Sequence, residues 1–227
     1  MQPNFCLKGK STFIRGLLSE HKHHFDVGEK EIIKNIFYFH LESESNTQQL
    51  RREFEKQENK NIEIKFSKRI PDNLSEEIPR CSIVVFDDME NQFANDKNLQ
   101  NQLFHFSSVL CHHKKIFLIF VAQSVGVLKK NHKLCSCISQ ATHFVLFRNI
   151  VESKSLLRFL SSLSIKMKSG LSLGETYEKY ILPYRYAYIC LNVSPRSEKS
   201  TAFSNILLCD SGSMLSFHED EEDDEQI

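Results

Sequence analysis

The segment from Arg80 to Glu90 constrains the fold more than any other part of the sequence. Its apolar, β-branched run, Ser82 to Phe86, stops abruptly at the adjacent carboxylates of Asp87 and Asp88. An unbroken run of this kind is typical of a strand buried on both faces, as in a parallel sheet. Ligands of open α/β sheets bind at the carboxyl ends of the strands. The run therefore predicts an α/β fold with two acids at the ligand-binding edge; a strand that ends in a solvated Asp-Asp turn is the alternative.

Other apolar runs predict the rest of the sheet and the helices that flank it. Strands are expected at 34–40 and 116–122 as buried strands, at 62–66 as an edge strand, at 143–147 as a fourth apolar strand, and at 186–193 and 202–208 as a terminal β-hairpin. Helices are expected at 46–59, 99–110, 155–165 and 172–181. In the second of these helices, Leu103, Phe104 and Phe106 are predicted to face inward. The order of elements predicts a mostly parallel sheet with helices around it.

Length and composition are those of one soluble globular domain. The chain has 227 residues, of which 41% are hydrophobic and 26% charged, so a sizeable core is expected within a single domain at 1–209. Apolar runs fall well short of the ~20 residues of a membrane span, and the first residues lack the apolar core of a signal peptide. Seven scattered cysteines favour reduced thiols over a disulfide framework. We expect a soluble intracellular protein that is not secreted.

The net charge of zero hides a strong asymmetry along the chain. Seven acids lie between Glu219 and Glu225, in a tail at 210–227 that is predicted to be disordered. Without these seven, 29 basic residues stand against 22 acidic ones (29 minus 7). A basic body of this kind attracts polyanions such as nucleic acid, although a solvated basic face is an equally simple interpretation.

The sequence Gly9-Lys10-Ser11-Thr12 matches the second half of a phosphate-binding loop, and an amphipathic helix pattern follows it at once. In such loops the glycine lets backbone N–H groups approach phosphates, the lysine reaches the β/γ oxygens, and the Ser hydroxyl binds Mg²⁺. Asn4 stands where the first glycine of the motif falls. No strand pattern precedes the loop, so the first strand is expected to be missing or incomplete. A lysine-rich helix start is the alternative.

The strand at 116–122 ends in Gln123-Ser124. An amide at the end of a strand beside the acid-ending strand predicts a sensor that contacts the γ-phosphate or the attacking water. A helix N-cap by Ser124, with Gln123 merely exposed, is the alternative.

The loop after this strand is basic and is a candidate contact for the DNA backbone. It carries Lys129, Lys130 and Lys133, and further lysines, Lys114 and Lys115, lie at other element ends.

Taken together, the motifs resemble a viral genome-packaging ATPase of the FtsK–HerA superfamily, in the forms carried by poxvirus-like, adintovirus and Polinton/Maverick-type elements. The resemblance covers about residues 9 to 209. It rests on the order and spacing of motifs that include Leu103-Phe104-His105, Cys111-His112-His113, Phe120-Val121-Ala122-Gln123-Ser124 and the segment from Thr142 to Phe147-Arg148-Asn149.

The resemblance implies a RecA/FtsK-like P-loop fold, the cofactors ATP and Mg²⁺, and hydrolysis coupled to translocation of double-stranded DNA. The cofactor-binding residues would be Gly9, Lys10, Ser11 and Thr12, with Ser11 and Asp87 on the metal. The catalytic residues would be Asp88, which orients water, and Gln123. The protein would act as a hexameric or pentameric ring, with the viral capsid as a further partner and no membrane partner. Virion, host nucleus and host cytoplasm are the implied locations.

Two features depart from the family. Lysines occupy the loop after the Gln strand where the family tends to carry an arginine, so Arg148 is the candidate for an arginine finger supplied in trans. With the incomplete loop, this leaves a second hypothesis open: a truncated or host-integrated remnant that binds nucleotide or DNA without hydrolysis. A third, a nucleotide kinase, would need an arginine-rich lid, which the sequence lacks.

Overall fold

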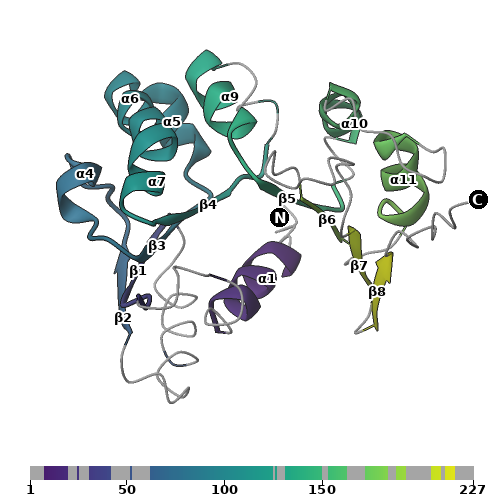
Figure 1. Cartoon of the computed structure of the whole chain (residues 1–227). Coiled ribbons are helices and arrows are strands. Elements are labelled where there is room, and N and C mark those ends of the chain that lie inside the picture. The colour runs from purple at the N-terminus through teal and green to yellow at the C-terminus, as the bar shows by residue number, and fades with distance from the viewer. Residues whose placement is uncertain are drawn as a thin grey trace, which may run out of the picture. The chain divides into compact units, whose positions relative to one another are not determined.

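The computed structural model describes residues 8–19, 25, 31–41, 52, 62–124, 126, 131–149, 153–162, 172–183, 188–192, 206–210 and 213–217. The chain divides into two compact units, Met1–Gln140 and Ala141–Ile227 (Figure 1). The boundary falls inside the single domain, 1–209, that the sequence predicts. The predicted helix at 46–59 apart from Arg52, the loop residues Lys129 and Lys130 and the acidic residues 219–225 lie outside the described residues.

The first unit is built on a parallel four-stranded sheet, as predicted from the apolar runs. Its strands are β1 (Asn35–His40), β2 (Glu63–Ser67), β3 (Ser82–Asp87) and β4 (Phe117–Val121). They lie in the order β2-β1-β3-β4, and every neighbouring pair is parallel. The α/β class and the edge position of β2 are therefore confirmed.

Strands β3 and β4 differ in burial although their sequences are equally apolar. All six residues of β3 are buried, because β3 pairs with β1 on one side and β4 on the other. Four of the five residues of β4 are only half-buried. The prediction of a second fully buried strand at 116–122 is wrong on this point, since β4 is the last strand of its sheet among the described residues.

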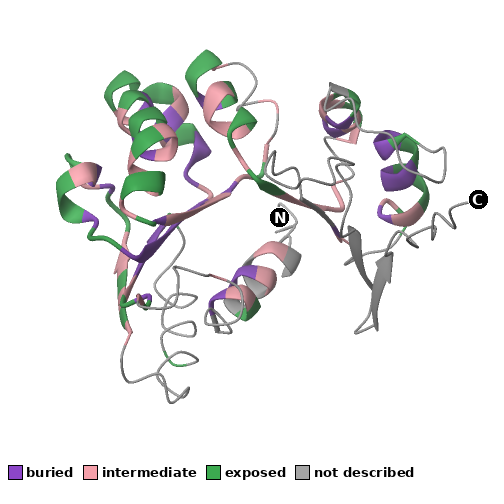
Figure 2. Cartoon of the chain, in the orientation of Figure 1, coloured by how far each residue is buried: buried purple, intermediate pink, exposed green. Residues whose placement is uncertain are grey.

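Helices cover both faces of this sheet (Figures 1 and 2). One face carries α4 (Leu74–Glu77), α5 (Glu90–Asn95), α6 (Lys97–His105), the π-helical turn η1 (Phe106–Leu110), α7 (Cys111–His113) and α9 (His132–Ser139). The other face carries α1 (Lys8–Ser19).

Alternation along β1 and β3 divides the buried side chains between two cores. Phe86 packs with Phe93 and Leu103 on the face of α5 and α6. Val85 packs with Leu18 on the face of α1. Successive residues of a strand point to opposite faces, so one apolar run feeds both layers. Each fully buried Leu, Val or Phe side chain contributes about 1.5–3 kcal/mol of transfer free energy.

The helical segment from Lys97 to His113 contains the predicted helix at 99–110. It begins at a side-chain cap, where Asp96 accepts hydrogen bonds from the backbone N–H groups of Asn98 and Leu99. Leu103 and Phe106 are buried as predicted, whereas Phe104 is 38% exposed and its predicted inward position is wrong. Adjacent helical residues lie about 100° apart, so Leu103 and Phe104 cannot both face the sheet.

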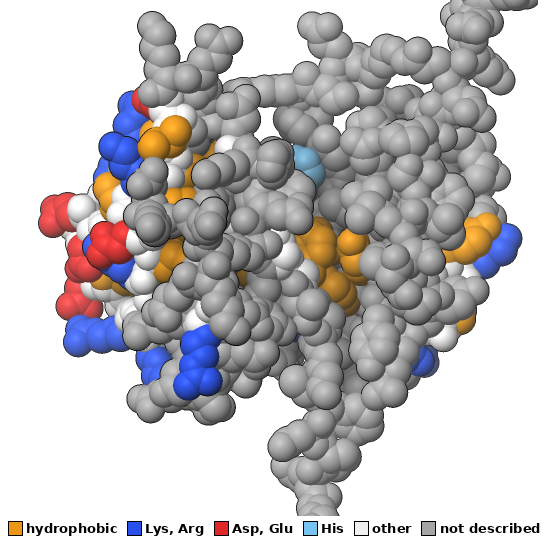
Figure 3. Space-filling view, turned by 90° about the horizontal axis from the view of Figure 1, so that it is seen from below, with side chains coloured by type: hydrophobic (Ala, Val, Ile, Leu, Met, Phe, Trp, Pro, Cys, Tyr) orange, Lys and Arg blue, Asp and Glu red, His pale blue; other side chains and the backbone are white. Residues whose placement is uncertain are grey.

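Acidic and basic side chains are intermixed on the described surface of this unit. Figure 3 shows red and blue side chains next to one another along one side of it. Exposed ion pairs of this kind include Arg69 with Asp72, at 3.1 Å, and Lys65 with Glu63, at 3.5 Å. The predicted basic excess does not gather into one continuous field among the described side chains of this view.

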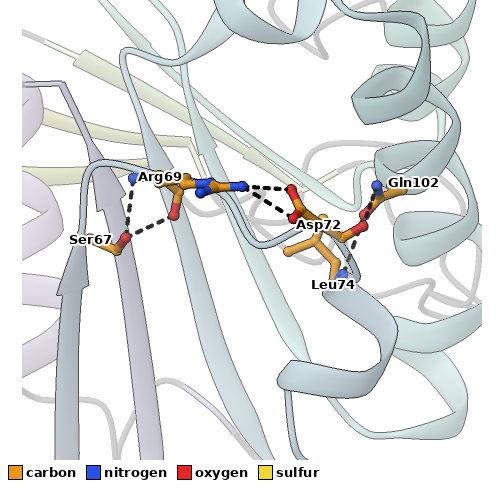
Figure 4. Close-up of polar contacts among 5 residues, drawn as sticks. All are labelled: Ser67, Arg69, Asp72, Leu74 and Gln102. Atoms are coloured by element: carbon orange, nitrogen blue, oxygen red, sulfur yellow. Dashed lines mark hydrogen bonds and ion pairs between the residues drawn. The ribbon is translucent and has the colours of Figure 1, made fainter.

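The connection from β2 to α4 is fixed by one amide (Figure 4). Gln102 on α6 donates through Nε2 to the carbonyl of Asp72 at 2.8 Å and accepts through Oε1 from the backbone N–H of Leu74 at 3.2 Å. The Arg69–Asp72 pair in the same connection has side chains that are 80% and 87% exposed. Exposed pairs contribute little, so Gln102 is the contact that joins this connection to α6.

The second unit contains an antiparallel sheet. Its strands β5 (His143–Phe147), β6 (Tyr188–Asn192), β7 (Ile206–Asp210) and β8 (Ser213–Phe217) follow one another in order. Its helices are α10 (Ser153–Ser162) and α11 (Leu173–Tyr180), close to the predicted ranges 155–165 and 172–181. Helix α11 begins with a capping box between Ser172 and Glu175.

The predicted terminal hairpin corresponds to the antiparallel pairing of β6 with β7. Strand β8 extends it and lies within the range, 210–227, that the sequence assigned to the tail. The strand at 143–147 is confirmed in its limits; it is half-exposed and pairs antiparallel with β6, so it does not belong to the parallel sheet. Whether a strand pairs parallel or antiparallel depends on the strand beside it, here β6, and the sequence of β5 alone does not reveal that partner.

Candidate functional site

The carboxyl ends of β3 and β4 are level with each other. In the register of the sheet, Asp87 lies opposite Val121 on one side and opposite His40 on the other. The backbone N–H of Asp88 also donates to the carbonyl of Val121 at 3.2 Å. The residues that follow the two strands, Asp88 and Gln123, are thereby brought to the same edge, as the sequence predicts for parallel strands.

Lys10 reaches this edge from the first turn of α1. Its Nζ donates to the carbonyl of Ala122 at 3.0 Å and lies 3.6 Å from Oδ1 of Asp88. The side chains of Lys10 and Asp88 are 14% and 23% exposed, so solvent screens this pair less than a surface pair. Helix α1 thus presents its lysine to the acid-ending strand, which is the arrangement that a phosphate-loop lysine requires.

Asp88 has an uncommon backbone conformation and two side-chain partners. Its φ is 56°, in the left-handed region that Asp tolerates better than most residues. Gln123 donates through Nε2 to its Oδ2 at 2.6 Å. The predicted catalytic acid and the predicted sensor therefore contact each other directly.

Asp87 is 4% exposed and accepts a short hydrogen bond of 2.5 Å at Oδ2 from the hydroxyl of Tyr38. Tyr38 lies on β1, two residues before the register partner of Asp87, and it is 5% exposed. Tyr38 is not among the site residues predicted from the sequence. A phenol in the apolar strand Asn35–His40 was the available signal, because a buried hydroxyl needs a polar partner.

Glu90, in the first turn of α5, was missed as well. It is 3% exposed, and its Oε1 accepts the backbone N–H of Gln123 at 3.0 Å. Its position two residues after Asp88 was the available signal. The partner could not be read from the sequence, because the contact joins residues 33 positions apart.

The other predicted residues fall as follows. Gly9, Ser11 and Thr12 lie in the first turns of α1, and their side chains are outside the described set, as are Asn4, Lys129 and Lys130. Lys133 lies in α9, where its Nζ donates to Oδ1 of Asn101 on α6.

Arg148, the candidate arginine finger, is half-buried in the second unit and donates through Nε to the carbonyl of Leu182 at 2.8 Å. Beside it, the hydroxyl of Tyr177 donates to the carbonyl of Phe147 and accepts from the backbone N–H of Asn149, both at 2.9 Å. Burial raises the pKa of Tyr177, so this hydroxyl keeps its proton. The Phe-Arg-Asn segment is thus fastened to α11, and this gives Arg148 a structural role.

Lys114 and Lys115 lie at the opposite, amino end of β4, away from the two acids. Lys114 donates through Nζ to the carbonyls of Ser75 and Ile78, at 2.5 and 3.0 Å, and closes the end of α4. Lys115 forms an ion pair of 2.7 Å with Glu31. Both lysines are thus engaged in contacts within the first unit.

Hard oxygen ligands at the carboxyl edge suit Mg²⁺. Magnesium binds proteins through one or two carboxylates and takes its other ligands from water and substrate phosphates. Buried oxygens of two acids, Oδ1 of Asp88 and Oε2 of Glu90, accept no hydrogen bond from any described residue. Among the described residues, no group of three or more His, Cys, Asp or Glu side chains could hold a metal ion. The carboxylates of Asp87 and Asp88 could therefore serve a metal only if it arrives with water and a phosphate-bearing substrate as its other ligands.

Comparison of the chain with protein-family models, with curated proteins and with solved structures gives no match. None of the helices described is long and apolar enough to cross a membrane.

Proposed function

We propose that this chain is a P-loop ATPase domain that hydrolyses Mg-ATP at the carboxyl edge of the parallel sheet. One observation carries the proposal: Lys10, Asp88 and Gln123, from three separate elements, meet within hydrogen-bond or ion-pair distance. A lysine at a helix start, an acid at a strand end and an amide at the next strand end are the set that phosphoryl transfer uses.

Each residue of the set has a definite task in this proposal. Lys10 binds the β/γ-phosphate oxygens, and Asp87 with the hydroxyl of Ser11 holds Mg²⁺, which supplies neutralisation of the phosphate charge. Asp88 orients the attacking water. Gln123 contacts the γ-phosphate and passes from its hydrogen bond with Asp88 to the substrate.

The coupling of hydrolysis to translocation of double-stranded viral DNA by a ring of subunits is the wider proposal. It is supported by the resemblance in motif order and by the basic excess of the body. The surface that would contact DNA includes Lys129, Lys130 and Lys133.

Turnover of ATP, with and without duplex DNA, tests both levels. We expect Lys10→Ala and Asp88→Asn to lower kcat by about 100-fold or more, since each removes a charge that acts on the reacting phosphate. The matched controls are Lys65→Ala and Asp72→Asn, which alter exposed residues of the same types. Turnover that is insensitive to Lys10 and Asp88 would refute the site.

Stimulation of turnover by duplex DNA is expected of a translocase, and turnover without stimulation would limit the function to ATP hydrolysis. Binding of Mg-ATP without any turnover would favour the alternative of a non-hydrolysing nucleotide- or DNA-binding module.

A further inference from the structure

Glu90 is a buried acid for which the proposed ATPase has no task so far. Its side chain is 3% exposed, although it occupies the first turn of a surface helix. Acids in a first turn are normally solvated and act only on the helix dipole. Glu76 in the first turn of α4 is of this ordinary kind, since it is exposed.

The burial of Glu90 is unfavourable by itself. Its Oε2 is buried and has no hydrogen-bond partner among the described residues. A carboxylate oxygen in this state carries a desolvation penalty that the rest of the molecule has to offset. An unsatisfied buried group therefore asks for a functional explanation.

The one described hydrogen bond of Glu90 fixes the backbone of the proposed sensor. Its Oε1 accepts the N–H of Gln123 at 3.0 Å, while the side chain of Gln123 donates to Asp88 at 2.6 Å. Asp88 and Glu90 are only two residues apart, so these two hydrogen bonds join the same short segment to both the backbone and the side chain of Gln123. Residue 123 is held at its backbone by one acid and at its amide by the other.

The two preceding residues of this segment are held as well. The carbonyl of Val121 accepts from the N–H of Asp88 at 3.2 Å, and the carbonyl of Ala122 accepts from Nζ of Lys10 at 3.0 Å. Glu90 therefore continues, at the backbone of Gln123, the series of contacts that holds residues 121 and 122.

We infer that Glu90 is a positioning residue, which holds Gln123 in the orientation where its amide reaches the catalytic acid and the γ-phosphate. The inference rests on the proposed function. This role needs only a hydrogen-bond acceptor at the position of Oε1. Glu90→Gln keeps such an acceptor and should retain the role, whereas Glu90→Ala removes it.

Steady-state turnover and nucleotide affinity of the full chain test the inference. We expect Glu90→Ala to lower kcat about 10-fold or more, because small misplacements of a catalytic group are costly, while the Kd of a non-hydrolysable Mg-ATP analogue changes less than about 3-fold. Glu90→Gln should keep kcat within about 3-fold of the wild type. Glu76→Ala, the matched control, should change neither quantity.

A double-mutant cycle separates positioning from general support of the fold. In a Gln123→Ala background the amide to be positioned is gone, so adding Glu90→Ala should lower kcat by less than about 2-fold further. Full additivity of the two changes would overturn the inference. Equal loss of kcat in Glu90→Gln and Glu90→Ala would overturn it too, since Oε2 would then have a task of its own.

Hydrogen exchange at the backbone N–H of Gln123, the group that donates to Glu90, gives a readout that does not need activity. We expect this backbone N–H to exchange about 10-fold faster in Glu90→Ala than in the wild type, and to stay protected in Glu90→Gln. Wild-type protein without turnover would refute the proposed ATPase while this exchange result still reported on the hydrogen bond. Unchanged exchange in Glu90→Ala would refute the positioning role itself.

Discussion

The two ends of the parallel sheet both hold acids against basic side chains, yet they are satisfied to different degrees. At the amino end, Glu31 receives Nε of Arg80 at 3.1 Å, Nζ of Lys115 at 2.7 Å and the thiol of Cys81 at 3.3 Å. At the carboxyl end, Asp88 forms an ion pair of 3.6 Å with Lys10, and Oδ1 of Asp88 and Oε2 of Glu90 accept no hydrogen bond from any described residue.

The contrast shows which feature marks a site. Left-handed backbone occurs at both ends, at Cys81 and Lys115 as well as at Asp88, so backbone strain does not distinguish them. The balance of charge and donors does. At the amino end, the carboxylate of Glu31 finds all these partners within the protein, in a cluster with Arg80, Cys81 and Lys115, as expected of a structural contact. The carboxyl end has acceptors in excess, as a site that awaits a cation and phosphate should have.

The strongest test of this contrast separates activity from stability at Asp88. We expect Asp88→Asn to abolish most turnover yet leave the melting temperature within about 2 °C of the wild type, because it relieves repulsion among three acids while losing one ion pair. Asn also tolerates the left-handed backbone. Circular dichroism melts beside the ATPase assay provide the measurement. A large drop in melting temperature would mean that the carboxyl end is a structural cluster as well.

A smaller loss of activity is expected when the support of Asp87, the proposed metal ligand, is removed. Tyr38→Phe deletes only the hydroxyl that donates to Asp87. We expect turnover to fall about 10-fold and the Mg²⁺ concentration for half-maximal turnover to rise, since outer partners of a metal ligand typically change affinity 10–100-fold. Tyr180→Phe, which alters a partly exposed tyrosine of α11, is the control. An unchanged Mg²⁺ dependence would remove Asp87 from the metal site.

At the amino end the expected effect is on stability and depends on pH. The hydrogen bond from Lys115, followed by those from Cys81 and the charge of Arg80, lowers the pKa of Glu31 below its ordinary value of 4.5. A lowered pKa means that the contribution to stability is complete above pH 4.5 and is lost as the pH falls through the folded-state value.

Glu31→Gln should therefore melt below the wild type at neutral pH, and the difference should shrink as the pH falls below 4.5. Turnover at neutral pH should be retained. Thermal melts across a pH series measure this, with Glu63→Gln as an exposed control that also faces a lysine. A difference that persists at low pH would show that Glu31 acts through packing.

The smallest effects are expected in the connection between β2 and α4, which serves as a reference for both ends. Gln102→Ala removes two hydrogen bonds to the backbone and should lower the free energy of unfolding by about 1 kcal/mol. Arg69→Ala removes an exposed pair and should change it by about 0–0.5 kcal/mol. Urea unfolding measures both, and a reversed order would mean that the exposed pair is stronger than its environment suggests.

Much of the first unit could be predicted because its signals are local. The apolar run before Asp87 and the amide after β4 place Asp88 and Gln123 at strand ends, and parallel strands bring these ends together. Tyr38 and Glu90 were missed because their roles depend on register and on contacts between distant segments. The burial of β4 was overestimated for the same reason, since a strand's neighbours are a property of the fold and not of the strand.

The second unit shows the limit of the same signals. The sequence of β5 is as apolar as that of a parallel core strand, and its limits were predicted correctly. The apolar run contains no signal for its direction, because pairing with the hairpin strand β6 decides that direction. Apolar content thus identified where the strands lie, whereas the neighbouring strands decided the direction and burial of each one.

The contact of Lys10 with Ala122 also has a consequence for the order in which the chain can assemble. It joins residues 112 positions apart. Strand β1 likewise pairs with strands that begin at Glu63 and Ser82, which are synthesised later. During synthesis from the amino end, the lysine is therefore present long before the segment that receives it. Closing so long a loop requires the entropy of the intervening chain to be overcome first, which slows folding. The candidate site is thus completed late in folding, and a chain that stops before β4 lacks Gln123 and the carbonyl of Ala122 that Lys10 binds.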